Sequence, residues 1–141
     1  MRERDEIFVF ERGAFFSGQL CYKIIKTDGK YIFSGRGMNA FYRMKRIEFE
    51  LPENELNNLY KVLEAVCEWK AEYKPDAHIL DGYGWSLYFY HEGDRVESHG
   101  YEAYPSNYKK VIKGLQEYIE NICAKYDSNY ETAGLEKRLA L

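Results

Sequence analysis

Two stretches of this sequence carry apolar side chains at helical spacing, and each has to bury its apolar stripe against another element. In the first stretch, the apolar positions are Leu56, Leu59, Tyr60, Leu63, Val66 and Cys67. In the second, they are Val111, Ile112, Leu115, Ile119 and Ile122, with Tyr108, Tyr118 and Cys123 at the margins. Polar residues fill most of the other positions, so we predict two amphipathic helices. Gly114 in the second helix predicts a close crossing over the sheet, because a helical glycine otherwise costs about 1 kcal/mol.

The ends of the first helix are marked by two prolines. Pro52 can begin a helix, because its missing N–H is not needed in the first turn. Glu53 and Glu55 then lie on the polar side and complement the positive end of the helix dipole. We expect the helix to end by Tyr73, because Pro75 disfavours helical geometry at the residue before it.

Most of the remaining sequence is typical of β-strands joined by short turns. The predicted strands cover residues 6–10, 19–26, 30–34, 43–51, 85–90 and 95–101. Asp28-Gly29 is the strongest turn signal, because both residues tolerate the positive φ angles of a type I′ hairpin. A second hairpin is expected to turn at Glu92-Gly93.

Helices and strands in these proportions predict an α+β fold. With 141 residues, the chain has the length of one domain, and we expect residues 1–126 to form it. Residues 127–141 are then a C-terminal tail, with a short docking helix as one interpretation. Both helices must lie on one face of an antiparallel sheet of five or six strands, which gives a two-layer sandwich. The other face is left open, and we expect any surface function to lie there.

The two predicted hairpins also resemble each other in sequence. At one constant offset, Tyr22 aligns with Trp85 and Gly37 aligns with Gly100. In both places the hairpin is followed by Gly-x-x-Ala-aromatic and then by a helix. This indicates, as an alternative to chance similarity, a degenerate internal duplication of a hairpin–helix unit.

The second hairpin predicts which side chains share a face of the sheet. With its turn at Glu92-Gly93, Trp85 faces Gly100 on the helix-covered side, where the missing side chain leaves room for the indole. The open side then carries Tyr88, Tyr90, Arg95, Glu97, His99 and Tyr101. We predict that these residues contact a partner or ligand, because tyrosine is enriched at interfaces. The alternative is a solvated face whose cross-strand pairs only stabilise the sheet.

Charge and cysteine content argue against several classes of function. The 20 basic and 23 acidic residues leave a net charge of −3, which does not favour binding to nucleic acid or anionic lipid. No apolar run has the length of a membrane helix, and no signal peptide pattern is present. Cys21, Cys67 and Cys123 are far apart and form no disulfide framework. We therefore expect a cytoplasmic protein, with Cys67 and Cys123 packed as small apolar residues.

Motifs for catalysis and metal binding are missing from the sequence. His91 and His99 are expected on opposite faces of one hairpin and far apart along it, so they cannot share an ion. There is no GxSxG or HExxH motif and no His/Cys ligand spacing. We predict no catalytic residues, no metal and no cofactor. A basic cluster remains as a secondary prediction of an anion contact, and it consists of Arg36, Arg43, Lys45 and Arg46.

The segment from Asp81 to Leu115 resembles a pattern found in small bacterial α+β proteins. The residues that carry the resemblance are Asp81, Gly82, Trp85, Ser98, Gly100, Ala103, Tyr104 and Pro105. The resemblance covers about a quarter of the chain. It implies a bacterial cytoplasmic domain and brings no catalytic residue with it. The residue types themselves indicate a folding role: glycine for space, Asp-Gly for a turn, and proline to begin a helix.

Three hypotheses for function follow from this sequence. The first is a non-catalytic binding or protein-interaction module that uses the open, tyrosine-rich sheet face. The second is a small enzyme or ligand-binding domain, with a pocket where Asp81, His99, Tyr101 and Tyr104 converge. The third is a structural domain that forms a homodimer through its open face. The partner is thus an unidentified protein, a small ligand or a second copy of the chain.

Overall fold

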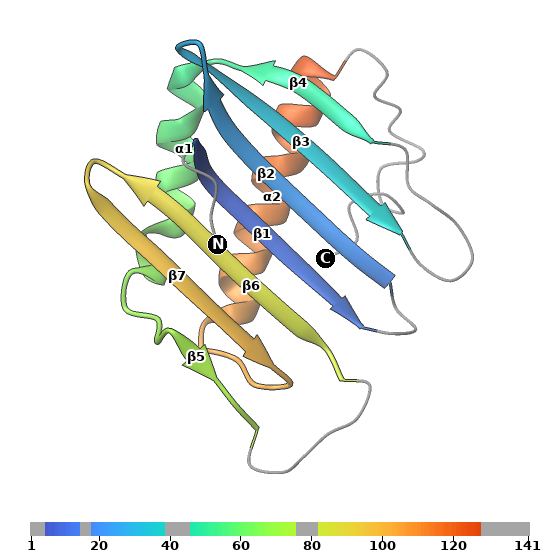
Figure 1. Ribbon diagram of the computed structural model, residues 1–141, viewed down its shortest axis with the longest axis vertical. Coiled ribbons are helices and arrows are strands. Elements are labelled where there is room, and N and C mark those ends of the chain that lie inside the picture. Colours follow the sequence, from blue (N-terminus) through green and yellow to red (C-terminus); the bar gives the residue numbers. More distant parts are fainter. Residues whose placement is uncertain (1–4, 15–17, 39–45, 76–81, 128–141) are drawn as a thin grey trace.

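The computed structural model shows an α+β fold with two layers (Figure 1). It describes residues 5–14, 18–38, 46–75 and 82–127. The strands in these ranges are β1 (Glu6–Ala14), β2 (Gly18–Thr27), β3 (Lys30–Met38), β4 (Ile47–Leu51), β5 (Glu72–Tyr73), β6 (Gly84–His91) and β7 (Asp94–Tyr101). The helices are α1 (Glu53–Leu63) and α2 (Tyr108–Tyr126), and a short 3₁₀ helix, η1 (Glu64–Val66), follows α1. The predicted C-terminal tail, residues 127–141 with its docking helix, lies outside the described residues apart from Asp127.

The strands form one sheet in the order β4-β3-β2-β1-β6-β7-β5. β1 lies in the middle and pairs antiparallel with both β2 and β6. The prediction of an α+β fold is confirmed, but the prediction of a purely antiparallel sheet with five or six strands is wrong. The described sheet has seven strands, and the short edge strand β5 runs parallel to β7.

Strand β5 exists because the first helix ends earlier than its sequence pattern predicts. The α-helical part stops at Leu63, and the 3₁₀ turn that follows ends at Val66. The chain then returns to the sheet, where the backbone N–H of His99 donates to the carbonyl of Ala71 over 3.0 Å. Cys67, predicted to be packed on the apolar stripe, is consequently out of phase and exposed.

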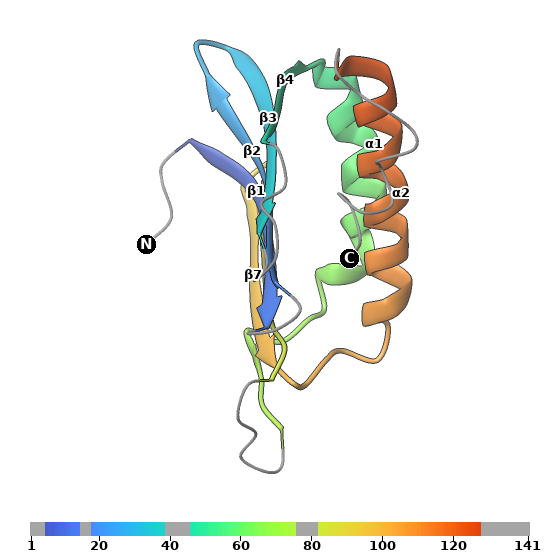
Figure 2. The same ribbon diagram turned by 90° about the vertical axis from the view of Figure 1, so that its right-hand side faces the viewer.

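Both helices lie on the same side of the sheet, as predicted (Figure 2). The core between the two layers is built from alternate residues of the central strands and from the helix stripes. Its fully buried large side chains are Phe8, Phe10, Tyr22, Ile24, Phe33, Leu51, Leu59, Leu63, Leu87, Leu115, Ile119 and Ile122. The start of β1 and the turn of the β2–β3 hairpin bend away from the helices. The start of β1 carries a register shift between Glu6 and Phe8, the kind of bulge that bends a strand.

The two predicted hairpin turns are confirmed. Asp28 and Gly29 have φ angles of 51° and 75°, and Glu92 and Gly93 have φ angles of 48° and 87°. Two consecutive residues with positive φ form a type I′ turn, which matches the twist of the flanking strands. In the second hairpin, Trp85 lies opposite Gly100, as the turn position predicts.

The arrangement of the hairpins does not support an internal duplication. β2 and β6 both run antiparallel to β1, and the partner strands β3 and β7 lie outside them. The two hairpins are therefore placed as mirror images within the sheet, with both helices on one face. Two copies of one hairpin–helix unit would be related by a rotation, and no rotation produces this mirror-image arrangement with both helices on one face. The two turns also do not match each other at the offset that aligns Tyr22 with Trp85.

Two further details of the helices differ from the predictions. Gly114 does not mark a crossing over the sheet, because a Cβ atom there would meet Val62 of α1, 3.3 Å away. Glu55, predicted on the polar side of α1, is buried. Its carboxylate accepts from Asn58 and pairs with Lys125 of α2 at 3.4 Å, which satisfies the buried charge.

The described residues that carry the sequence resemblance form a packed corner at the start of β6 and the end of β7. The indole N–H of Trp85 donates to the carbonyl of Ala103 over 2.9 Å, and the ring lies on Gly100. Ser98 is buried, and its hydroxyl donates to the carbonyl of Lys70 over 2.6 Å. These contacts support the folding role that the residue types indicate. Asp81 lies outside the described residues.

We expect Gly100→Ala to lower the free energy of unfolding by about 1–3 kcal/mol, the usual range for overpacking. The new Cβ would lie 2.5 Å from both the carbonyl oxygen of Ala103 and Nε1 of Trp85. Gly114→Ala is the matched control, because its Cβ meets only the side chain of Val62, at 3.3 Å, and alanine favours the helix. Urea unfolding measures both variants, and equal stability of the Gly100 variant and the native protein would contradict the packing argument.

We expect Tyr22→Phe to raise the free energy of unfolding by about 1 kcal/mol. The Tyr22 hydroxyl is buried and has no hydrogen-bond partner among the residues that the structure describes. Burial, followed by the nearby Cys123, raises the pKa of this group above its usual range. Thermal unfolding measures the change, and a loss of stability in the variant would show that the hydroxyl does make a stabilising contact.

Candidate functional site

The candidate site lies on the sheet face that neither described helix covers (Figure 2). Strand alternation places one set of side chains from β6 and β7 on this face, and they pair across the hairpin. The pairs are Ser86 with His99, Tyr88 with Glu97, and Tyr90 with Arg95. These are the partners that the turn position predicts, so the sequence placed these side chains on the correct side of the sheet.

The two tyrosines on this face of the β6–β7 hairpin differ in exposure. The side chain of Tyr90 is 45% exposed, whereas that of Tyr88 is only 5% exposed. Tyr88 lies beside Val9 of β1, which is itself buried on this face. Tyr88 is therefore packed into this face of the sheet and presents little surface to a partner, contrary to its predicted role as a contact residue.

His99 lies on β7, next to the edge strand β5, and has a partner that was not predicted from the sequence. Its Nε2 atom is 3.1 Å from Oε2 of Glu72, the residue beside it on β5. An ionised carboxylate can only accept, so the imidazole N–H donates. This bond, followed by one from Lys74, lowers the pKa of Glu72 from its ordinary value of 4.5. No sequence pattern indicated this pair, because β5 has only two residues.

The predicted pocket residues at the end of the hairpin have separate contacts. The hydroxyl of Tyr101 accepts from the backbone N–H of Gly82 over 2.6 Å. The ring of Tyr104 instead packs against Tyr83 and Tyr108, with centroids 5.9 and 4.9 Å away, on the helix side of the sheet. Tyr104 therefore does not join His99 and Tyr101. The fourth residue, Asp81, lies outside the described residues.

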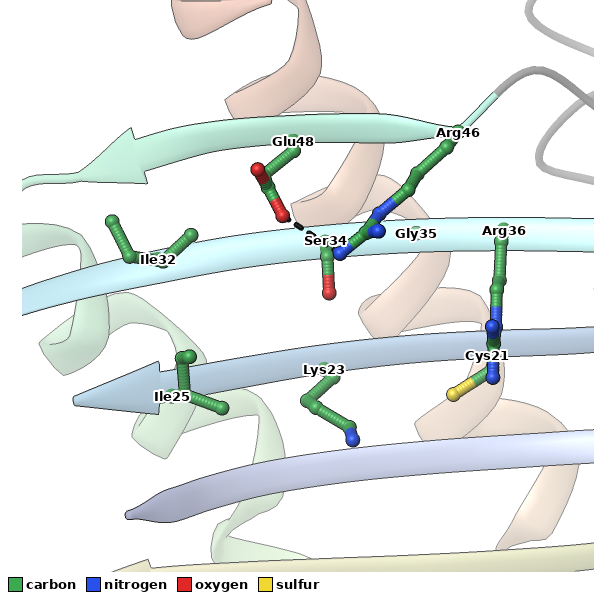
Figure 3. Close-up of a pocket in the computed structure, with 9 residues that line it drawn as sticks. All are labelled: Cys21, Lys23, Ile25, Ile32, Ser34, Gly35, Arg36, Arg46 and Glu48. Atoms are coloured by element: carbon green, nitrogen blue, oxygen red, sulfur yellow. Dashed lines mark hydrogen bonds and ion pairs between the residues drawn. The ribbon is translucent and has the colours of Figure 1, made fainter. Parts of the chain in front are cut away.

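A shallow depression lies on the same face over β2, β3 and β4, with a volume of about 230 Å³ (Figure 3). Its lining residues are Cys21, Lys23, Ile25, Ile32, Ser34, Gly35, Arg36, Arg46 and Glu48. Cross-strand pairing arranges most of them in rows. Ile25 lies opposite Ile32, and Cys21 lies opposite Arg36. The depression is therefore apolar towards the β2–β3 turn and polar towards the other end.

The positive charges in the depression come from three separate segments, at β2, at β3 and just before β4. Nζ of Lys23 lies 2.7 Å from Oε2 of Glu6, and the guanidinium of Arg46 lies 2.8 Å from Oε2 of Glu48. Arg36 is exposed and extends over β2 beside Cys21 (Figure 3). Arg36 and Arg46 belong to the predicted anion contact, and the structure brings them to one depression. Arg43 and Lys45 lie outside the described residues.

The cysteine of this depression is not activated. Burial, followed by the charge of Glu11, raises the pKa of the Cys21 thiol, although Lys23 and Arg36 act in the opposite direction. A thiol with a raised pKa carries little of the nucleophilic thiolate at neutral pH. Within the described ranges, no three His, Cys, Asp or Glu side chains lie where they could hold a metal ion.

Comparisons of this chain with protein-family models, curated proteins and solved structures gave no match. The resemblance of residues 81–115 to small bacterial proteins therefore stays a prediction. No helix in the described part of the chain has the length and apolar character needed to cross a membrane.

We expect His99→Thr to raise the pKa of Glu72 towards 4.5, because threonine removes the first of the two bonds that lower it. Lys74→Gln is the comparison and should give a smaller rise. A carboxyl group with a lowered pKa stabilises the fold above its unfolded-state pKa and loses that contribution as the pH falls through the lower value. The stabilisation by this pair is thus lost below pH 4.5. NMR titration of the Glu72 carboxyl carbon tests this, and an unchanged midpoint in the His99 variant would contradict it.

Proposed function

We propose that this protein is a non-catalytic binding module that contacts a protein partner through the open face of its sheet. The observation that carries the proposal is the pair of Tyr90 and Arg95. They lie directly opposite each other on β6 and β7, both are exposed, and neither helix covers them. Tyrosine and arginine are the residue types most often found at the energetic centres of protein interfaces.

The surroundings of this pair resemble those of an interface centre. Tyr88 and Val9 are buried next to it, so the exposed ring of Tyr90 stands on a well-packed part of the sheet. Glu97 lies opposite Tyr88 and adds a charged group on the same face. An apolar ring on a rigid base with charged neighbours can bind with little loss of conformational entropy.

The separation of reactive side chains also favours binding over catalysis. His99 lies on β7 and Cys21 lies on β2, and the two strands β1 and β6 run between them. Catalysis by a nucleophile and a base needs both groups within hydrogen-bond distance of each other. The assignment to a bacterial cytoplasm rests on the sequence resemblance and the cysteine content, and it remains part of the proposal.

The proposal is tested by comparing partner binding by the native protein with that of a double variant, Tyr90→Thr and Arg95→Thr. Threonine keeps the preference for a strand but removes the ring and the charge. The native protein is immobilised to identify retained proteins by mass spectrometry, and the affinity for the purified candidate is then measured by calorimetry. We expect the double variant to bind at least about tenfold more weakly, as for the loss of interface anchors.

The control combines Lys113→Ala and Glu117→Ala on the exposed side of α2. We expect it to bind the partner as the native protein does. Equal affinity of the Tyr90/Arg95 variant and the native protein would refute the proposal, as would a partner that only the α2 variant fails to bind. Sedimentation of the same proteins shows whether the partner is a second copy of the chain.

A further inference from the structure

The depression over β2, β3 and β4 differs in chemistry from the surface around Tyr90. One end carries three cationic side chains, Lys23, Arg36 and Arg46, which come from separate segments of the chain. The other end carries Ile25 and Ile32, which are half-buried and lie directly opposite each other. Figure 3 shows the side chains of both ends on the sheet side away from the helices.

We propose that this depression binds a carboxylate of an acidic side chain on the protein partner, with an aliphatic side chain of the same extended segment against the isoleucines. The inference rests on the proposed function, because it states what the partner presents to this half of the sheet. Arg36 is the central residue of the site.

The charge arrangement favours a single negative charge. Lys23 is already paired with Glu6, and Arg46 is already paired with Glu48. Among the described residues that line the depression, Arg36 is the remaining cation. A guanidinium group matches a carboxylate in geometry, because two parallel N–H groups can donate to its two oxygens.

A doubly charged anion fits this site less well. Glu11 is close enough to raise the pKa of Cys21, and Glu6 and Glu48 also lie at or beside the depression. A phosphate monoester carries a charge of about −1.5 to −2 at pH 7, so these carboxylates would repel it more than a carboxylate. Arg36 compensates one negative charge, and the second charge of a dianion would stay uncompensated beside these carboxylates, so a monoanion matches the site better.

The isoleucine end of the site requires an aliphatic group on the ligand in addition to the carboxylate. Ile25 and Ile32 lie one row of residues from Lys23 and Ser34, and two rows from Arg36, on the same face. Rows on one face of a strand are about 7 Å apart, which is also the spacing between alternate side chains of an extended peptide. An extended segment with an acidic residue four positions from an aliphatic residue, both on one side of the chain, can thus contact both ends.

The test uses the peptide acetyl-Leu-Ser-Leu-Ser-Glu-amide, in which these side chains share one side of an extended chain. Binding is followed through the backbone amide signals of Cys21, Ser34 and Arg36 in NMR spectra. We expect saturable shifts at millimolar peptide. The peptide with glutamine in place of glutamate should bind about tenfold more weakly, as for the loss of one charge-assisted pair.

Arg36→Gln should weaken binding of the glutamate peptide by a similar factor, and Lys113→Gln, on the exposed side of α2, should leave it unchanged. Absence of saturable shifts, equal binding of the two peptides, or full binding by the Arg36 variant would overturn the inference. Tighter binding of inorganic phosphate would overturn the choice of a carboxylate. If hexanoate, a small carboxylate with an aliphatic chain, bound as tightly as the glutamate peptide, the ligand would be a small molecule and not a segment of a protein.

The two proposals fail separately. The affinity of the Tyr90/Arg95 variant for its partner depends on β6 and β7, whereas the peptide measurement depends on β2, β3 and β4. A negative peptide result together with weakened partner binding by that variant leaves the proposed function in place and removes only the carboxylate site.

Discussion

The pairing of β1 with both hairpins is the interaction on which the rest of this fold depends. β1 joins β2 on one side and β6 on the other, so it turns two separate hairpins into one sheet. Phe8 lies between Ile24 and Phe89, and both of its neighbours are buried with it on the helix side. Because of this strand, the two helices share a single apolar surface.

The pairing of β1 also determines which side chains lie on the opposite face of the sheet. Side chains alternate along a strand, so the residues of β1 that do not face the helices, Val9 and Glu11, lie at the centre of the open face. Val9 is buried next to Tyr88, and Glu11 lies opposite Cys21. The central strand thus divides the open face into an aromatic half over β6 and β7 and a mixed half over β2, β3 and β4.

Those parts of the fold that depend on local chemistry could be predicted from the sequence. A type I′ turn fixes the register of a hairpin, so Glu92-Gly93 was sufficient to give the cross-strand neighbours in the β6–β7 pair. β5 could not be predicted, because a strand of two residues has no periodicity. Its position depends on hydrogen bonds from β7, such as that from Ser98 to Lys70.

The candidate sites were predictable to a similar extent. Turn chemistry placed Tyr90 and Arg95 on one face. The exposure of a side chain depends on its neighbours in space, so the sequence could not show that Tyr88 is buried. Arg36 and Arg46 are close in sequence and were recognised as a cluster. Lys23 was missed because only the pairing of β2 with β3 brings it to them.

The order of the elements has a consequence for synthesis on the ribosome. The surface formed by Phe10 and Tyr22 belongs to the first two strands, but α2, which runs behind them in Figure 1, follows all seven described strands in the chain. A nascent chain that has already made its first hairpin must therefore keep an aromatic surface uncovered until residues 108–126 emerge. An intermediate with such an uncovered apolar surface is prone to aggregate, and it is the kind of species that chaperones bind.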